Sequence, residues 1–508
     1  MLKFVVSEDN NWLSLVDYGE DFERRQIEIS LTRKIHNHFF HPLVKKKVWD
    51  GSICFIDKKA PIWRVPIGLW SEIYTICEKY KIPVEIEGLD KFIQTSLTLE
   101  KFTEWCDQFF EGKKFKPRDY QIETAWRIIK FKLSVSEVAT SSGKTLIAFM
   151  VLAYLKQVYK IKKFLMVVPN ANLIMQGSED FEEYGLDELE GCELQQIHGG
   201  NKKKLSTGLM IGTYQSLVKM EPEFYEDVEA VFVDETHQSH SASIKKVLSM
   251  CRDSKWRFGL SGTLTNKSSA EYLTIQQFLG PLVMEISPKF LFDNKYATPV
   301  FVKIVKMDWL DQEVKEKLSN LKKNKSDIDG KDLFNIEKKL VIGSDKRLNF
   351  IIGFINKVSK NSLVLFNSVG EGYGKRIYDG IREISSEKEV FYIDGDTNPE
   401  TREIFIEKME EGENKILVAS FGTLSTGISI KKIHNIFLTE SYKSEVVVKQ
   451  TIGRGMRLSD GKEVVNIIDF VDDFSFDGNS NYLLQHSKER IEIYKREKME
   501  YKIYNVKL

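Results

Sequence analysis

Val135-Ser-Glu-Val-Ala-Thr-Ser-Ser-Gly-Lys-Thr-Leu-Ile-Ala-Phe-Met150 is the stretch that decides the fold of this chain. It reads as a short β-strand, a turn of small residues and the start of an apolar helix. A triphosphate needs closely spaced backbone N–H groups, a cation and a hydroxyl for Mg²⁺ at one helix N-terminus. The turn supplies them in Ser141, Ser142, Gly143, Lys144 and Thr145. We therefore predict a loop that binds the phosphates of ATP, with Thr145 as a ligand of Mg²⁺.

This phosphate-loop motif departs from its usual form at one position. The pattern G-x-x-x-x-G-K-[ST] has a glycine where this chain has Val138. A Gly-Lys turn that only caps a core helix would look the same locally. The choice between the two interpretations therefore depends on partner motifs elsewhere in the chain.

Length and charge set the frame for those motifs. The chain has 508 residues, 42% of them hydrophobic, which suits about three domains of ordinary size. Lys plus Arg and Asp plus Glu both number 74, so the chain lacks the overall basicity of many nucleic-acid binders. Any site for a polyanion must therefore be a local basic patch.

Cysteine usage and hydropathy indicate the compartment. The five cysteines are widely scattered and form no Cys-x-x-Cys pair, which favours reduced thiols and no structural zinc. No apolar run approaches the ~20 residues that span a bilayer, and the N-terminus lacks a basic segment followed by an apolar one. We expect a cytoplasmic protein with no membrane partner.

Residues 1–110 are predicted to form a small α+β domain. Basic residues concentrate in residues 33–64, and we expect residues 52–57 and 62–67 to be the strands of a hairpin. Aromatic residues interleave with these bases at Trp49, Phe55 and Trp63, a pattern that suits phosphate contacts and base stacking. The alternative is a solvated basic hairpin whose aromatic residues are core. The predicted nucleic-acid contacts are Lys45, Lys46 and Lys47.

Residues 111–300 are predicted to form an ATP-binding lobe, which a short basic linker at 111–117 joins to the first domain. Arg118-Asp-Tyr-Gln121 precedes the phosphate loop by one helix and one strand. A Gln amide both donates to and accepts from an adenine edge. We therefore predict that Arg118 and Gln121 bind the nucleotide, although a Gln at a helix start is also common on ordinary surfaces.

Ala230-Val-Phe-Val-Asp-Glu-Thr-His237 is the partner motif that the phosphate loop requires. An apolar strand here delivers two adjacent carboxylates at its carboxyl end. Asp234 is placed to hold Mg²⁺, and Glu235 to orient and deprotonate the attacking water. We expect His237 to report the state of the γ-phosphate to neighbouring loops.

Two further apolar runs, at 164–168 and 209–213, read as parallel strands that are buried on both faces. The loops after such strands lie where open α/β sheets place their ligands. Pro169, Asn170 and Thr213 stand in these loops, and we predict that they contact a nucleic-acid backbone. The strongly acidic segment at 179–193 is expected to face away from any polyanion.

Residues 301–508 are predicted to form a second lobe with its own parallel sheet, preceded by a peripheral helical segment at 307–345. The strand candidates are 362–366, 389–393, 415–420, 435–438 and 464–469. No Gly-Lys-Thr occurs here, so one nucleotide serves both lobes. Arg454 and Arg457 lie three residues apart, and on a helix both would project from one face toward the transition-state charge. The alternative is an ordinary surface helix that carries two arginines. The loop of small residues at 419–428, just upstream, argues against this alternative.

These motifs, in this order and spacing, resemble those of superfamily 2 helicases and translocases of the DExH type. More narrowly, nearly the whole chain resembles the recombination helicases of large tailed phages. The residues that carry the resemblance are Arg118-Asp-Tyr-Gln121, Ser141-Ser-Gly-Lys-Thr145, Asp234-Glu-Thr-His237, Leu260-Ser-Gly-Thr263, Ser425-Thr-Gly427 and Gln450-Thr-Ile-Gly-Arg-Gly-Met-Arg457.

The resemblance implies two RecA-like lobes, each a parallel α/β sheet, and ATP hydrolysis coupled to movement along DNA. It implies remodelling of branched DNA and R-loops, in the host cytoplasm if the chain is phage-encoded. It also assigns further residues: Gly427 and Gln450 to the nucleotide, Ser261 and Thr263 to coupling, and Ser420 and Thr426 to the nucleic acid.

Several alternatives stay open at this stage. The same motor motifs occur in translocases of restriction or defence complexes and in RNA helicases, and a non-enzymatic nucleic-acid-binding module is a third class. RNA–DNA hybrids are a further possible substrate. We expect a monomer, with a single-strand-binding protein or a recombinase as an open question.

Overall fold

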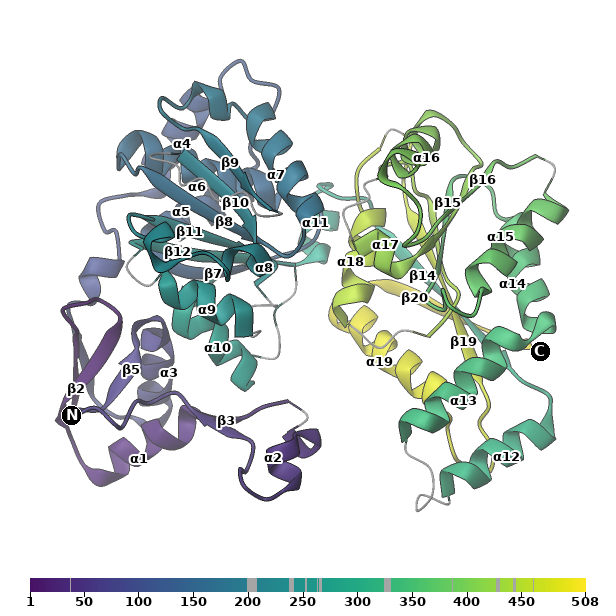
Figure 1. Ribbon diagram of the computed structural model, residues 1–508, viewed down its shortest axis with the longest axis horizontal. Coiled ribbons are helices and arrows are strands. Elements are labelled where there is room, and N and C mark those ends of the chain that lie inside the picture. Colours follow the sequence, from purple (N-terminus) through teal and green to yellow (C-terminus); the bar gives the residue numbers. More distant parts are fainter. Residues whose placement is uncertain are drawn as a thin grey trace. The chain divides into compact units, whose positions relative to one another are not determined.

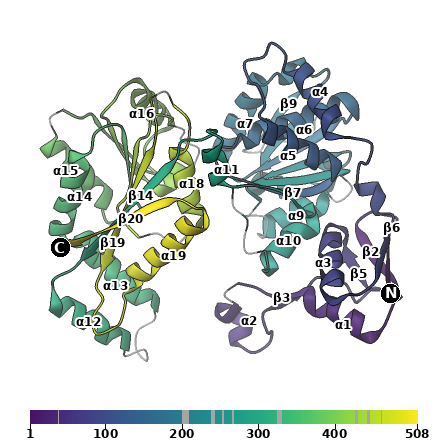
Figure 2. The same cartoon turned by 180° about the vertical axis from the view of Figure 1, so that it is seen from behind.

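Two seven-stranded parallel sheets and one small mixed sheet organise this chain (Figure 1; Figure 2 from behind). The computed structural model describes residues 1–36, 38–198, 208–236, 242–251, 254–262, 264, 267–323, 330–385, 387–425, 430–441, 445–459 and 461–508. By its contacts the chain divides into one unit, Met1–Ile286, and a second, Ser287–Leu508. The predicted fold class, two RecA-like lobes with a small α+β N-terminal domain, is confirmed. The domain boundaries at 110 and 300 stay a prediction.

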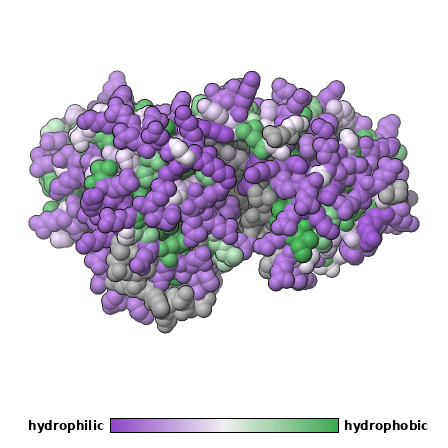
Figure 3. Space-filling model, turned by 90° about the horizontal axis from the view of Figure 1, so that it is seen from above, coloured by the Kyte–Doolittle hydropathy of each residue, from purple (hydrophilic) through white to green (hydrophobic). Residues whose placement is uncertain are grey.

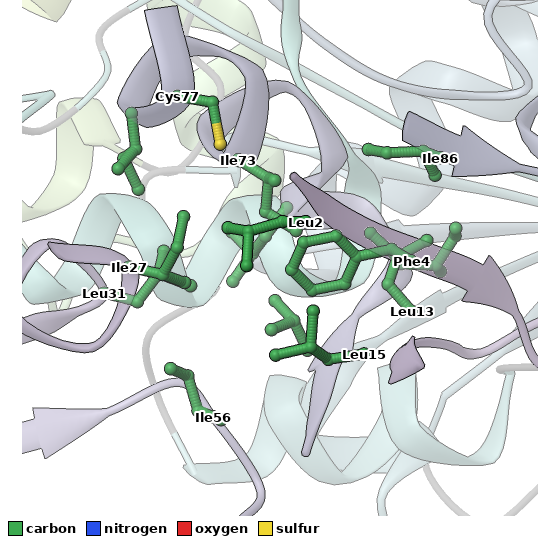
Figure 4. Packing of buried hydrophobic residues seen from close by; sticks show 14 of the residues in the cluster. Leu2, Phe4, Leu13, Leu15, Ile27, Leu31, Ile56, Ile73, Cys77 and Ile86 are labelled. Carbon is green, nitrogen blue, oxygen red and sulfur yellow. The ribbon is translucent and has the colours of Figure 1, made fainter. Parts of the chain in front are cut away.

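The N-terminal module has a four-stranded sheet in the order β5-β2-β1-β6. Strand β1 pairs antiparallel with β2 and parallel with β6, and helices α1 and α3 cover the sheet. Alternating apolar residues of β1 and β2 point into a core with Ile27, Ile73 and Cys77 from the helices (Figure 4). The bounds are β1 Leu2–Val6, β2 Trp12–Tyr18, α1 Asp21–Ser30, β5 Arg64–Pro66, α3 Trp70–Tyr80 and β6 Val84–Glu87.

The predicted hairpin of residues 52–57 and 62–67 is wrong. Strand β4 (Ser52–Cys54) pairs with β3 (Thr32–Lys34), and β5 pairs with β2, so only the bridge between Asp57 and Arg64 joins the two segments. Each of these strands pairs instead with a strand that precedes it in the sequence. For β5 the reason is that its apolar residues complete the core of the four-stranded sheet. The basic residues therefore lie on a separate two-stranded ribbon, β3–β4. It carries η1 (His38–Phe40) and α2 (Pro42–Lys45) at its tip.

The N-terminal module packs directly on the ATP lobe. Leu133 and Leu273 of that lobe belong to the module's own core cluster. Helix η2 (Ile67–Leu69) lies against α10 (Ala270–Leu279), and a Cβ on Gly68 would come within 2.0 Å of the backbone oxygen of Gln276. The sequence suggested a tethered module, but this packing holds the two together by contact as well as by the chain.

The ATP lobe is a parallel sheet in the order β13-β7-β12-β11-β8-β10-β9. All residues of the central strands β8, β10 and β12 are buried, as their continuous apolar sequences predict. The strands are β7 Leu133–Val138, β8 Lys163–Val168, β9 Leu194–Ile197, β10 Gly208–Thr213, β11 Ala230–Asp234, β12 Trp256–Ser261 and β13 Leu282–Ile286.

Helices cover both faces of this sheet (Figure 1). Helix α6 is apolar on all sides because it is buried between the sheet and its neighbouring helices. Helix α4 packs on it through aromatic contacts, among them Phe102 and Trp105 on Tyr154. The helices are α4 Leu99–Phe109, α5 Asp119–Lys130, α6 Lys144–Val158, α7 Ala171–Glu183, α8 Tyr214–Leu217, α9 Ala242–Met250 and α10.

The acidic segment at 179–193 meets the basic linker. Lys113 pairs with Glu188 at 2.7 Å and Lys114 with Glu183 at 2.6 Å. Part of the acidity is therefore matched by the protein's own lysines, and the linker lies against the lobe.

The second unit is a parallel sheet in the order β16-β17-β15-β18-β19-β14-β20. All five predicted strands are present, but β14 and β20 were missed; β20 joins the sheet by pairing with β14 from the far end of the sequence. The strands are β14 Val300–Asp308, β15 Ser362–Phe366, β16 Val390–Ile393, β17 Ile416–Ser420, β18 Asn435–Leu438, β19 Val465–Asp473 and β20 Glu500–Lys507.

Residues 307–345 begin in β14 and then form helices, with a small core of their own. Leu318 and Val341 pack there with Phe474 and Leu483. The helices of this unit are α11 Pro288–Asp293, α12 Gln312–Lys323, α13 Gly330–Gly343, α14 Asp345–Lys357, α15 Tyr373–Ile384, α16 Pro399–Glu411, α17 Phe421–Ser425, α18 Glu445–Gly455 and α19 Tyr482–Arg496. The face seen in Figure 3 is mostly hydrophilic, and no described helix is long and apolar enough to cross a membrane.

Candidate functional site: the phosphate loop and its neighbours

The turn between β7 and α6 has the backbone shape of a ligand cradle. Ser141 and Gly143 both have left-handed φ angles, of 67° and 79°. Such angles turn successive N–H groups toward a common side, and Gly143 adopts its angle without strain. Gly143 is the N-cap of α6, so Lys144 and Thr145 stand in the first turn of a helix whose N-terminus favours an anion.

Gln121, predicted to contact adenine, lies against the phosphate loop in this structure. Its Nε2 donates to the backbone oxygen of Ser142 at 2.8 Å, while its Oε1 accepts from the backbone N–H of Arg118 at 2.9 Å. The hydroxyl of Tyr120 donates to the same Ser142 oxygen at 2.7 Å. Arg118 is the N-cap of α5. The Arg-Asp-Tyr-Gln segment therefore braces the loop, and its contact with a nucleotide stays a prediction.

Tyr120 was missed by the sequence reasoning. The signal was present, because this tyrosine stands between the two residues that were chosen and a buried phenol normally needs a hydrogen-bond partner. What could not be read from the sequence is which carbonyl it reaches.

Lys144 and Glu235 form the central ion pair of the site. The Nζ of Lys144 lies 3.2 Å from Oε1 of Glu235, and the side chains are only 15% and 14% exposed. Burial by itself lowers the pKa of Lys144, but the carboxylates of Glu235 and Asp234 and the hydrogen bond from Lys144 to Glu235 outweigh it. The pKa of Lys144 is thus raised above its ordinary value, and the lysine carries a full positive charge.

Asp234 and Glu235 stand at the carboxyl end of β11, as the sequence predicts. An Oδ1 of Asp234 accepts the backbone N–H of Glu235 at 3.0 Å, and Glu235 has a left-handed φ of 50°. The left-handed region costs a glutamate conformational free energy, and residues strained in this way are often found at functional sites. At this turn the chain leaves the direction of the strand, and the Glu235 carboxylate points toward Lys144.

The end of β12 closes the site from the next strand. Ser261 Oγ donates to Oε2 of Glu235 at 3.3 Å. The backbone N–H of Leu264 donates to Oε1 of Glu137 at 3.1 Å, which ties the segment after β12 to the strand before the phosphate loop. Glu137 was also missed, because a glutamate inside an apolar strand carries no motif.

Several predicted residues lie outside the described residues. They are His237, Thr263, Thr426 and Gly427. Gln450 and Arg454 lie on α18, but their side chains are not described. Their assigned roles stay predictions.

Arg457 follows the C-terminal end of α18 in the second unit. Its backbone oxygen accepts from Thr298 Oγ1 at 3.2 Å and from Lys462 Nζ at 2.8 Å. Burial lowers the pKa of Lys462 to about 8, against a smaller opposite effect of Glu410, and the charge of Arg457 lowers it further. The backbone of Arg457 is thus held by two donors from its own lobe.

The predicted nucleic-acid contacts after the strands act as helix caps. Asn170 Oδ1 accepts the N–H of Leu173 at 3.1 Å at the start of α7, and Thr213 Oγ1 accepts that of Ser216 at 3.3 Å at the start of α8. Gln215 Nε2 reaches the backbone oxygen of Pro169 at 3.4 Å and so links the two loops. In the second unit Ser420 Oγ lies 2.7 Å from Thr423 Oγ1. Both lobes therefore place hydroxyl or amide groups at the carboxyl ends of their strands.

Lys45, Lys46 and Lys47 of the N-terminal module are exposed, whereas the aromatic residues chosen with them are buried or half-buried. Phe55 is buried in the core of the module, Trp63 packs against that core, and Trp49 donates its Nε1–H to the oxygen of Ser52 at 2.8 Å. Phe55 is thus a core residue, whereas Trp63 is half-buried, with Lys58 Nζ 5.2 Å from its ring centroid. Lys45, Lys46 and Lys47 extend from the tip of the β3–β4 ribbon into solvent.

The residues predicted to hold Mg²⁺ are a hydroxyl and a carboxylate, Thr145 and Asp234. Mg²⁺ bound to a nucleotide takes one or two protein oxygens and completes its shell with phosphate and water. Within the described residues no group of three or more His, Cys, Asp or Glu side chains could hold a metal ion. A hydroxyl and a carboxylate are oxygen donors of the kind that Mg²⁺ takes from a protein.

Two family models match the chain. Residues 114–266 match the model described as type III restriction enzyme, res subunit, and residues 346–459 match the helicase conserved C-terminal domain. The first match contains the phosphate loop and the two carboxylates at the end of β11. The second contains Arg454 on α18 and Arg457 just after this helix.

Curated relatives and solved structures match as well. The chain is 28% identical over 491 residues to the ATP-dependent DNA helicase UvsW of Enterobacteria phage T4, covering 92% of this chain and 93% of that protein. It is 24% identical over 371 residues to the DNA 3'-5' translocase XPB2 of Sulfurisphaera tokodaii, covering 68% and 80%. In fold it resembles the ATP-dependent type ISP restriction-modification enzyme LlaBIII bound to DNA, with a TM-score of 0.56 and 14% identity over 78% of this chain and 32% of that one.

Proposed function

Because this chain is an ATP-dependent superfamily 2 helicase, we propose that it remodels branched DNA and R-loops during recombination, repair and replication. The observation that carries the proposal is the cluster of Lys144, Asp234 and Glu235 at the carboxyl edge of a parallel sheet. The similarity to the ATP-dependent DNA helicase UvsW supports DNA as the substrate, since it extends beyond the motor to 92% of the chain.

The chemistry of the proposed site follows from the ion pair. Lys144 is held by Glu235, so a γ-phosphate that takes over Lys144 also releases the Glu235 carboxylate. Glu235 then accepts a proton from the water that attacks the γ-phosphate, while Lys144 binds the phosphate oxygens. Mg²⁺, held by Thr145 and Asp234, would neutralise phosphate charge. Arg454 and Arg457 of the second lobe would stabilise the charge of the transition state.

We propose the nucleic-acid path on the same basis. Pro169, Asn170, Thr213, Ser420 and Thr426 would contact the sugar-phosphate backbone, which sequence-tolerant motors grip. Lys45, Lys46 and Lys47 would add a second contact that distinguishes a branched substrate from a plain strand. Each phosphate contact that a lysine makes adds to the salt dependence of binding.

The test compares ATP turnover with four nucleic acids. Branched DNA should stimulate the ATPase of the full chain more than linear duplex, single-stranded DNA or RNA. Stimulation by RNA alone would replace the proposal with an RNA helicase. Equal stimulation by linear duplex and branched DNA would favour a translocase.

A motor for a restriction or defence complex is the second candidate. It is favoured by the match of residues 114–266 to the res-subunit model. Such a motor works with a nuclease, so a stable complex with a nuclease subunit would support it. We further propose action as a monomer in the host cytoplasm; a single-strand-binding protein or recombinase that raises ATP turnover would identify a partner.

A further inference from the structure

The tip of the β3–β4 ribbon exposes apolar side chains that nothing in the proposed ATP chemistry requires. Phe39 is 66% exposed and Phe40 70%, and Val48, in the turn after α2, is 72% exposed. Two adjacent phenyl rings that are exposed to water lack the burial of apolar surface that normally stabilises such residues. An exposed apolar cluster of this kind marks an interaction site.

The tip is an ordered structure. His41 caps α2, where its Nδ1 accepts the N–H of Leu43 at 3.3 Å, and Trp49 packs edge-on against His41 with ring centroids 5.1 Å apart. The backbone N–H of Val48 donates to the oxygen of Leu43 at 2.9 Å and closes the turn. Phe39 and Phe40 therefore belong to an ordered segment.

The charge of the tip selects its partner. Residues 32–49 contain five Lys and Arg residues, three histidines and no Asp or Glu. Lys45 lies over the ring of Phe40, with its Nζ 5.8 Å from the ring centroid, so cation and aromatic face are presented together. Aromatic faces among lysines fit a nucleic acid, whose bases stack and whose phosphates attract cations.

The ribbon is also joined to the motor. The backbone N–H of His36, at the base of the tip, donates to Oε1 of Glu271 at 2.9 Å, and Glu271 lies in the first turn of α10. Helix α10 follows the segment that Glu137 ties to the phosphate-loop strand. The tip is thus fixed to the lobe that binds ATP.

From these observations we propose that Phe39 and Phe40 stack on the bases exposed at a DNA branch point, while Lys45, Lys46 and Lys47 hold the flanking phosphates. This inference rests on the proposed function and adds the residues that recognise the junction itself. Within a continuous duplex each base is stacked on both sides, so the rings find a free base face only where a duplex ends or forks.

The test uses the full chain and a synthetic three-way DNA junction with 2-aminopurine at the branch point. Wild-type protein should change the fluorescence of this base, because stacking on a ring alters its environment. The F39A/F40A variant should lose that change and bind the junction about tenfold more weakly, as expected from base–aromatic stacking. The F39W/F40W variant, which keeps aromatic faces, should restore both.

Phe22 supplies the matched control. It lies on α1 of the same module and is 57% exposed, but it stands between Asp21 and Glu23. F22A should bind the junction as wild type does. Both Phe-to-Ala variants should keep the melting behaviour of wild type, since the rings they remove are exposed.

Salt dependence separates this inference from the proposed function. Reversal of the three lysines to Glu should weaken junction binding and flatten its salt dependence, whereas F39A/F40A should keep the wild-type slope. Unchanged junction affinity and fluorescence in F39A/F40A, together with weak binding by the lysine variant, would overturn the inference alone. A wild-type protein that binds linear duplex as tightly as the junction would overturn the proposed function. Loss of junction binding in F22A would also overturn the inference.

Discussion

In the ATP lobe Lys144 and Glu235 meet at the carboxyl edge of the sheet, whereas in the second lobe Arg347 and Asp472 meet inside the core. Arg347 is fully buried, and it donates from Nε and Nη2 to both oxygens of Asp472 at 2.7 and 2.9 Å. Its other bonds go to the hydroxyl of Tyr373 and the oxygen of Thr439. The ATP-lobe pair lies at the proposed nucleotide site, and the guanidinium of the second-lobe pair donates to protein groups.

A second buried pair repeats the pattern of the second lobe. Arg490 of α19 binds both oxygens of Asp469 on β19 at 2.8 and 2.9 Å, and Tyr494 donates to the same carboxylate at 3.0 Å. These pairs tie α14 and α19 to one strand of the sheet. Two similar sheets therefore place paired charges differently, at the proposed catalytic edge in one lobe and inside the core in the other.

The largest effect should come from the ATP-lobe carboxylate. Glu235→Gln keeps the shape of the side chain but removes the base, so steady-state ATP turnover with DNA should fall by about 10²- to 10⁴-fold. Lys144→Ala and Arg457→Ala should each reduce turnover by at least about tenfold. Glu285→Gln, at an exposed position of the edge strand β13 of the same sheet, should leave turnover unchanged. A folded Lys144→Ala protein that retains most of its ATPase activity would contradict the assignment.

The next largest effect is expected on the stability of the second lobe. Arg347→Met leaves Asp472 as a buried charge without its partner, which costs about 3–5 kcal/mol of unfolding free energy. Calorimetry of the full chain should show a large downward shift of the transition of the second unit. Adding Asp472→Asn should recover part of the loss, because the stranded charge is removed.

The same measurement on Lys144→Met sharpens the contrast. Lys144 lies at a partly exposed site, so its replacement by Met should lower the melting temperature much less than Arg347→Met does. Comparable shifts in the two variants would break the distinction between chemical and structural charges.

Much of this arrangement was predictable from the sequence. Three strands that carry the site are short, mainly apolar runs followed by polar residues, so β8, β10 and β11 were found where they occur. Asp234 and Glu235 followed from position alone, because the carboxyl ends of parallel strands share one edge.

What was missed depends on pairing between distant segments. Strand β20 is largely exposed and has no apolar signature, and only its pairing with β14 makes it part of the sheet. The misassigned hairpin has the same cause, since β4 and β5 each pair with a strand that precedes them. The contact of Gln121 with Ser142 is likewise tertiary, and an amide gives no sign of which partner it will choose.

A third prediction compares two lysines, one from each lobe. Carboxylates raise the pKa of Lys144, whereas burial lowers that of Lys462 to about 8 from an ordinary value of 10.5. Between these two pH values the unfolded chain keeps the proton on Lys462 and the folded chain has released it. The unfolded state then binds more protons, so raising the pH stabilises the fold, by at most about 3 kcal/mol.

Lys462→Met isolates this contribution. The melting temperature of wild type relative to the variant should increase as the pH rises from about 8 toward 10, because the other titrating groups are common to both. Parallel pH profiles for the two proteins would show that Lys462 keeps an ordinary pKa in the folded state.

The smallest effect separates capping from nucleic-acid contact. Asn170 caps α7 after a strand of the ATP lobe, and Asn398 caps α16 of the second lobe, where Oδ1 accepts the N–H of Thr401 at 2.8 Å. Each Asn-to-Ala change should cost about 1 kcal/mol of stability, since each leaves a helix donor without its cap. Only Asn170→Ala should also weaken single-stranded DNA binding in a filter or anisotropy assay, because Asn170 alone belongs to the proposed path. Equal DNA affinity in the two variants would leave Asn170 as a cap and remove it from that path.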